Sequence, residues 1–123
     1  MADGTLIKIA DKLAMFSDHW APRLVETLDG YDVKLAKFQG DFVWHRHEDA
    51  DELFFVVKGG FRMDFRDRQV AVGEGEMIVV PKGTEHKPYA ADECQVLVIV
   101  QSGNVNTGDA VPSAVTQRRM ERI

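Results

Sequence analysis

The chain has 123 residues, and 45% of them are hydrophobic, which is enough for one core and one domain. Fifteen basic and 20 acidic residues give a formal net charge of −5. Because no basic run and no basic face with interleaved aromatic residues is apparent, nucleic acid is not expected as a partner. The longest apolar runs have only five residues, so neither a signal peptide nor a membrane span is expected.

The N-terminal residues predict one short amphipathic helix. Leu6, Ile9, Leu13 and Phe16 recur at steps of three and four residues, and Pro22 stops any continuation. We expect residues 1–30 to form this helix and an extended arm, both packed on the outside of the core.

After Arg23 the pattern changes to short β-rich runs separated by turn residues, and it predicts at least eight strands. The run FRMDF alternates, so Phe61, Met63 and Phe65 should share one face of a half-buried strand. Evenly spaced strands of this kind are typical of an all-β sandwich or barrel. In a small barrel, alternate residues face an interior that can hold a ligand.

The single cysteine, Cys94, cannot form an internal disulfide and stands beside the apolar run VLVIV, where a small buried thiol is common. This favours a reducing, cytoplasmic location. Residues 102–123 lose all periodicity and collect Gly, Asn, Thr and Ser. They are interpreted either as a mobile terminus or as an arm that packs on a neighbouring subunit, since small barrels often form homodimers.

Four residues have the chemistry of a metal site: His45, His47, Glu52 and His86. Imidazole nitrogens and a carboxylate oxygen suit one divalent transition metal such as iron, manganese, nickel, zinc or copper. Histidines at positions i and i+2 project from the same side of a strand, whereas on a helix they would diverge by about 200°. The spacing therefore favours a β-sheet platform.

Glu52 follows His47 by an odd number of residues, so an unbroken strand would place the carboxylate on the opposite face. The intervening segment EDAD must therefore bulge or turn. Asp51 is the competing carboxylate if that bend is placed differently.

The stretch from Gly40 to Ala90 resembles the two motifs of the cupin superfamily, G(x)5HxH(x)3-4E(x)6G and G(x)5PxG(x)2H(x)3N. Eight positions fall at the family's spacing: His45, His47, Glu52, Gly59, Gly75, Pro81, Gly83 and His86. The distance to Gly59 favours Glu52 over Asp51. Two positions depart from the motifs, because Gly40 stands one residue too close to His45 and Ala90 replaces the final Asn. Neither position is a metal ligand in the family.

The resemblance implies a small antiparallel β-barrel of the jelly-roll type over residues 31–101, with the short helix before it. It also implies that His45, His47, Glu52 and His86 hold one Fe, Mn, Ni or Zn ion. The segments HWAPRLV and Asn106 to Gly108 are similar to those of small bacterial single-domain cupins that are often labelled mannose-6-phosphate isomerase-like. Candidates for the pocket wall are Phe54, Met63, Phe65, Met77 and Tyr89.

A metal with three imidazole ligands and one carboxylate keeps two octahedral positions for water or substrate. The leading interpretation is a small metal-dependent enzyme, an isomerase or an oxygenase, that acts on a carbohydrate derivative or keto acid inside the barrel. The sequence shows no evident cationic clamp for a phosphorylated substrate and assigns no general base. The alternative is a module without catalysis that binds a small ligand or uses the ion as a structural staple.

Overall fold

The computed structural model describes residues 2–117 and 119–123, and within them strands dominate. The elements in chain order are α1 (Ile9–Leu13), β1 (Arg23–Leu28), β2 (Tyr31–Asp41), β3 (Glu52–Lys58), β4 (Gly60–Phe65), β5 (Gln69–Gly73), β6 (Met77–Val80) and β7 (His86–Gln101). The predicted all-β fold with a short N-terminal helix is confirmed. The prediction of at least eight strands is wrong, because residues 42–44 form no strand and His45 makes only an isolated bridge.

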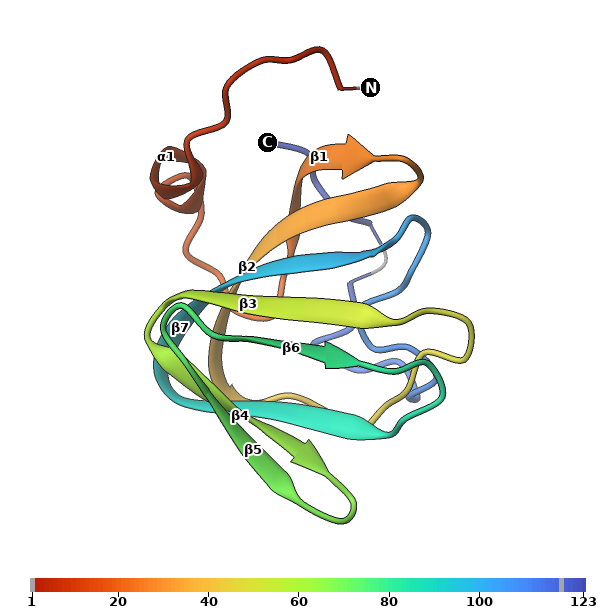
Figure 1. Ribbon diagram of the computed structural model, residues 1–123. Helices are drawn as coiled ribbons and strands as arrows, with labels where there is room; N and C mark the ends of the chain where they lie inside the picture. Colours follow the sequence, from red (N-terminus) through yellow and green to blue (C-terminus); the bar gives the residue numbers. More distant parts are fainter. Residues whose placement is uncertain (1, 118) are drawn as a thin grey trace.

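The named strands pair in antiparallel fashion, and the longest strand, β7, organises the sheet. The order of strands is β1-β2-β7-β3-β6, and β4 pairs with both β5 and β7. One edge of β7 pairs with β2, while its other edge pairs with β4 in its first part and with β3 in its second. Figure 1 shows the strands curving around a common interior, with the loops that follow β2, β6 and β7 gathered at one end.

Alternation along β2 separates the barrel interior from the face under the helix. Lys34, Ala36 and Phe38 are buried toward the interior. Leu35 points to the other face and packs with Leu13 of the helix in a second, smaller core. The helix is shorter than the Leu6 to Phe16 pattern predicts, and its N-cap residue, Lys8, provides no side-chain cap.

Strand β4 bears out the alternation of FRMDF, since Phe61, Met63 and Phe65 are all buried. Asp64 is buried as well, although it belongs to the other face. Arg62 donates to both of its carboxylate oxygens, at 2.6 and 3.0 Å, so the charge is not left unpaired.

The last residues of the chain lie along β1. The amide of Leu24 donates to the carbonyl of Glu121, and the amide of Ile123 donates to the carbonyl of Leu24. The C-terminus therefore lies at the edge of the sheet that β1 forms (Figure 1). Within the described residues, no helix is both long and apolar enough to cross a membrane.

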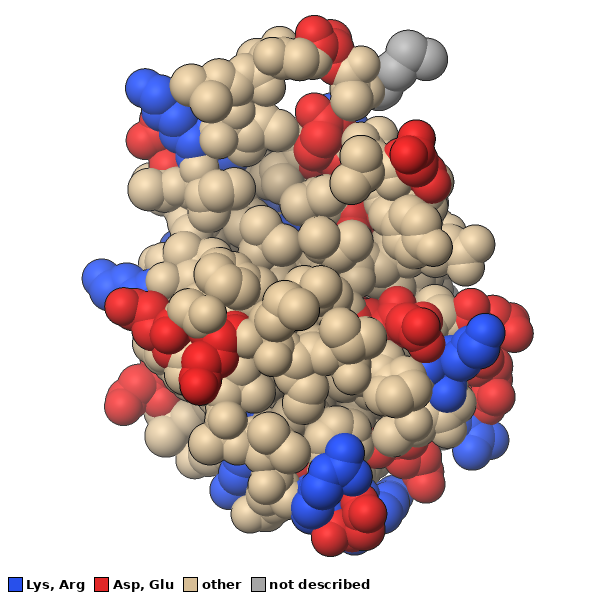
Figure 2. Space-filling view, viewed as in Figure 1, with Lys and Arg blue, Asp and Glu red and all other residues tan. Residues whose placement is uncertain are grey.

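Figure 2 shows acidic and basic side chains mixed around the edge of one face, with a largely uncharged area over its centre, where β3 and β6 lie. Two side chains of β6, Met77 and Val79, are exposed. Met77 pairs with Phe55 in the register, whereas the inward-facing Phe54 pairs with Ile78. Met77 thus stands on the outer face of the barrel and not in its interior.

Two methionines give a matched test of where the core lies. Met63 is fully buried and Met77 is 61% exposed. We expect Met63→Ala to lower the free energy of unfolding by about 2–5 kcal/mol, because it leaves a cavity. Met77→Ala should change it by less than about 0.5 kcal/mol. Urea unfolding of both variants measures the difference, and equal effects would contradict the assignment of the core.

Candidate metal centre

Four side chains from three separate segments meet at the end of the barrel where the loops gather. His45 and His47 come from the segment between β2 and β3, while Glu52 begins β3 and His86 begins β7. Each is at most 6% exposed. One donor atom from each residue can be chosen so that all four lie within 4.8 Å of one another. The four residues are therefore close enough to bind a single cation together.

Backbone hydrogen bonds hold the two histidine segments against each other. The amide of His45 donates to the carbonyl of His86 at 3.1 Å, and the amide of His86 donates back at 2.9 Å. The amide of Gly83 donates to the carbonyl of His47 at 2.8 Å, so the loop before β7 is also attached to the first segment. The position of His86 is thus set by the residues around His45 and His47.

The turn between His47 and Glu52 resolves the choice between two neighbouring carboxylates. Glu52 is buried in the cluster. The carboxylate of Asp51, which is exposed, accepts a hydrogen bond from the amide of Lys82 at 2.8 Å. Asp51 therefore helps to hold the loop after β6, and Glu52 faces the histidines.

Hydrogen bonds to the backbone orient two of the imidazole rings. His45 Nδ1 lies 2.8 Å from the carbonyl oxygen of Val43, and His86 Nδ1 lies 2.9 Å from that of Thr84. Since a carbonyl oxygen can only accept, Nδ1 carries the hydrogen in both rings. In the neutral rings, Nε2 then presents its lone pair, as a metal ligand requires.

The donor atoms at the centre lack the partners that buried polar atoms normally have. Among the described residues, His47 Nε2, Glu52 Oε1 and His86 Nε2 are buried without a hydrogen bond. His47 Nε2 is 3.2 Å and His86 Nε2 is 3.7 Å from Glu52 Oε1. Unsatisfied buried polar atoms are costly, and one cation would satisfy all three. The residues therefore fit a metal ion.

The charge states of the cluster also suit a cation. Burial, and after it the nearby charge of His86, lowers the pKa of His45 to about 4, so this ring is neutral at neutral pH. Burial raises the pKa of Glu52, but the neighbouring His47 and His86 outweigh burial and lower it overall. Glu52 is thus ionised when His45 is neutral, the combination that metal binding needs.

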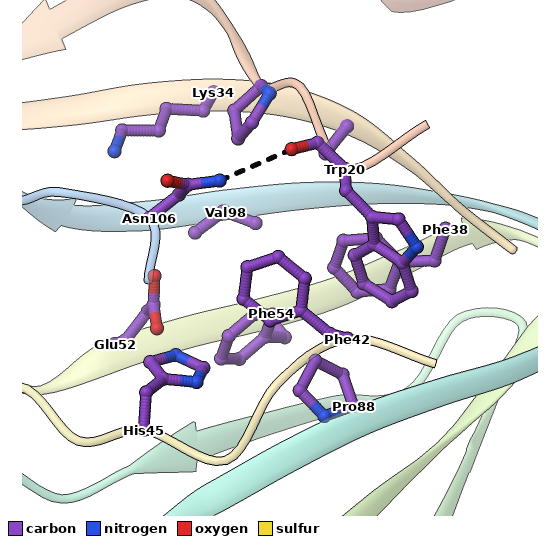
Figure 3. A pocket seen from close by; sticks show the side chains of 12 residues that line it. Trp20, Lys34, Phe38, Phe42, His45, Glu52, Phe54, Pro88, Val98 and Asn106 are labelled. Atoms are coloured by element: carbon purple, nitrogen blue, oxygen red, sulfur yellow. Dashed lines mark hydrogen bonds between the residues drawn. The ribbon is translucent and has the colours of Figure 1, made fainter. Parts of the chain in front are cut away.

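Beside the cluster lies a small cavity with mostly apolar walls (Figure 3). Its volume is about 30 Å³. His45 and Glu52 form part of its lining, so a molecule in the cavity would reach the candidate metal centre. Its apolar walls include Trp20, Phe38, Phe42, Phe54, Pro88 and Val98.

Trp20 closes one side of this cavity. Its ring stacks on Phe38 and Phe42, with centroid distances of 4.4 and 4.8 Å. Its backbone has φ 60°, in the left-handed region that bulky residues rarely adopt. Two hydrogen bonds hold it there, from its amide to the carbonyl of Lys37 and from its indole Nε1 to that of Gln39.

The predicted pocket residues lie in four different places. Phe54 lines the cavity. Met63 and Phe65 are buried in the core but are not part of the lining that the described residues form. Met77 is on the outer face, and Tyr89 borders a shallow depression elsewhere, where Arg62 lies 4.7 Å from its ring centroid.

The predicted set leaves out several residues of the cavity wall. Lys34, Ala36 and Phe38 alternate along YDVKLAKF, so the period of two could have assigned them to one face. Trp20 and Asn106 belong to segments without periodicity, and no sequence signal places them at the cavity.

A family model described as a cupin domain matches residues 31–100. The chain belongs to the cupin family. A crystal structure of a cupin-2 domain containing protein from Shewanella frigidimarina NCIMB 400 is similar, with 45% identity and a TM-score of 0.76, and the match covers 76% of this chain and 92% of that one. Protein NMB1881 from Neisseria meningitidis has 33% identity and a TM-score of 0.74, with coverage of 80% and 100%.

Among curated proteins, the uncharacterized protein YdbB of Bacillus subtilis (strain 168) is 36% identical to this cupin over 81 residues. The match covers 65% of this chain and 66% of the Bacillus protein, slightly less than two thirds of its length. These similarities extend the family assignment to the arrangement of the barrel. They do not identify a substrate.

The C-terminal residues of this cupin pack directly on the histidine segment. The amide of Arg46 donates to the carboxylate of Asp109 at 2.8 Å, and the amide of Asp109 donates to the carbonyl of Arg46 at 3.2 Å. Gly108 has φ +52°, and a Cβ atom there would clash with the Arg46 carbonyl and lie 3.0 Å from His47 Nδ1. Gly108 is therefore the residue that lets the two segments approach.

We expect Gly108→Ala to weaken metal uptake, because the added methyl group would push against Arg46 and His47. Gly103→Ala is the matched control, since Gly103 also has positive φ but nothing within 4 Å of its Cβ position. Both variants should lose about 1 kcal/mol of stability from backbone strain, and Gly108→Ala should lose more, because its Cβ atom would clash with the Arg46 carbonyl oxygen. Metal titration separates them, and equal affinities in the two variants would contradict this coupling.

Metal-free protein should lose stability as the pH falls from 6.5 to about 4. In this window His45 takes up a proton in the unfolded chain, where its pKa is near 6.5, but not in the folded protein, where its pKa is about 4. Protonation therefore favours unfolding. Urea midpoints across the window measure the slope, which His45→Gln should reduce. The same slope in both proteins would contradict the depressed pKa.

Proposed function

We propose that this cupin is a metal-dependent enzyme that acts on a small organic molecule inside the barrel. The observation that carries the proposal is the position of the unsatisfied donor atoms, which are buried next to a cavity and not in a closed core. A purely structural ion has no use for a neighbouring cavity, whereas a catalytic ion keeps an open position for substrate.

The ligands in this proposal are His45, His47, Glu52 and His86. A bound Fe, Mn, Ni or Zn ion would supply a Lewis acid or, for iron, a centre for oxygen chemistry. The protein contributes the orientation of the rings through Val43 and other backbone carbonyls, and it contributes apolar walls that exclude water. A carbohydrate derivative or keto acid is the proposed substrate, in an isomerase or oxygenase reaction.

A cytoplasmic location and a homodimer belong to the same proposal. Cys94 is a free, buried thiol, as expected for a protein in a reducing compartment. The uncharged area over β3 and β6, with Met77 and Val79 exposed, is a surface that a second copy could cover. Residues 31–101 are proposed as the barrel unit, with residues 1–30 and 102–123 packed on it.

We expect protein purified without a histidine tag or chelator to hold about one transition-metal ion per chain. His86→Ala should lower the metal affinity by about 100-fold or more, since it removes a direct ligand. His19→Ala is the control, because His19 lies outside the cluster and contacts the exposed Glu93. Elemental analysis and metal titration give the result, and equal metal content in the two variants would contradict the proposed site.

Removal of the metal by a chelator distinguishes between two hypotheses, a metal-dependent enzyme and a module that uses the ion as a structural staple. An open catalytic site predicts that the metal-free protein stays folded, with a lower unfolding midpoint but the same circular dichroism spectrum. A staple predicts that chelation unfolds the domain. Unfolding on chelation would therefore favour the metal-stapled module over the enzyme.

A further inference from the structure

One charged side chain lines the cavity on the same side as the candidate ligand Glu52. Lys34 lies on the inward row of β2, is 3% exposed and lines the same cavity as His45 and Glu52. Figure 3 shows its amine at the side of the cavity where the Glu52 carboxylate and Asn106 also lie. Lysine is rarely buried this far unless it is paired.

Within the part of the chain that the structure describes, the Lys34 ammonium has neither a hydrogen bond nor an ion pair. The carboxylates whose charges act on it are Glu52 and Asp32. Asp32 accepts a hydrogen bond from the Ser102 hydroxyl at 2.7 Å, and Glu52 is directed at the histidines. The charge of the Lys34 ammonium is thus balanced only by carboxylates that lie at a distance. None of its three N–H donors makes a hydrogen bond.

The neighbouring Lys37 shows what a structural lysine looks like in the same strand. It faces the other side of β2, is 8% exposed and donates to the carbonyl of Phe16 at 2.5 Å. Its ammonium also lies 5.0 Å from the centroid of the Phe16 ring. Lys37 has therefore found the partners that burial requires, and Lys34 has not.

The rest of the cavity lining offers little else to a polar ligand. Asn106 is polar, but its amide nitrogen donates to the carbonyls of Trp20 and Val115, and its oxygen accepts from the amide of Gln117. The other lining residues away from the metal ligands are mainly aromatic or aliphatic. A ligand in the cavity would thus meet metal-binding groups and, on the side of Glu52, an ammonium ion.

We propose that Lys34 binds the carboxylate of a small anionic ligand, a 2-oxo or 2-hydroxy acid, whose adjacent oxygen reaches the candidate metal centre. The inference rests on the proposed function, because it concerns the same cavity. A compact acid suits the small volume. A carboxylate suits a single lysine, whereas phosphate groups are commonly held by forked arginine contacts or several donors.

The test compares pyruvate with pyruvamide, which has nearly the same shape but no charge. Isothermal titration of wild-type protein, loaded with the metal that it retains on purification, should show tighter binding of pyruvate by about tenfold or more, as a charged hydrogen bond predicts. Lys34→Met should remove this preference and leave pyruvamide binding unchanged. Lys34→Arg, which keeps the charge, should retain part of it.

Lys37→Met is the matched control on the same strand. It should lower the thermal midpoint, because it removes the bond to Phe16, and it should keep the preference for pyruvate. Lys34→Met should leave the midpoint of the metal-loaded protein unchanged or raise it, because it removes an unpaired buried charge. These opposite signs distinguish a ligand-binding lysine from a structural one.

Two results would overturn the inference: a wild-type protein that does not prefer pyruvate over pyruvamide, or a Lys34→Met protein that keeps the preference. Equal, measurable binding of both compounds would instead favour an uncharged ligand such as a sugar. The metal content of the purified protein tests the proposed function separately. A protein that takes up no ion but prefers pyruvate through Lys34 would reject the metal enzyme and retain the anion site.

Discussion

The candidate site depends on a single pair of backbone hydrogen bonds, those exchanged by His45 and His86. These residues are far apart in the sequence, and their side chains meet because the two segments pair as an isolated bridge at the end of the barrel. The bridge fixes the distance between the two motifs. A local turn between His47 and Glu52 then completes the cluster. The carboxylate of Asp51 attaches this turn to the loop after β6.

Spacing predicts the metal ligands well, because it encodes geometry. The interval between His45 and His47 places both rings on one side of an extended segment, and the interval from Glu52 to Gly59 places the carboxylate at the start of β3. Residues 42–47 nevertheless do not form the strand that their composition predicts. The pairing of β2 with β7 ends at Asp41 and Tyr89, and beyond it this segment is joined to β7 by the bond from the Phe42 amide to the Pro88 carbonyl and by the bridge at His45.

The rest of the cavity wall was not predicted, for two different physical reasons. Lys34 fits the inward row of β2 by its period, but a lysine is normally assigned to solvent, because burying its charge is costly. Trp20 and Asn106 reach the cavity through tertiary hydrogen bonds to distant carbonyls. No local pattern encodes such contacts. Departures from local rules of this kind are expected to concentrate where a protein binds something.

The C-terminal residues link the cavity wall to the metal ligands. Asn106 is bonded to the carbonyl of Trp20, and two residues later Gly108 packs on the His47 ring, so one short loop touches both sides of the site. Thr107, between them, is 1% exposed. A loop anchored at both ends cannot move away from the ring without also disturbing Trp20. The same contacts that exclude water from the cavity therefore hold His47 in place, and the low dielectric that results strengthens the pull of Lys34 and of a bound cation on an anionic ligand.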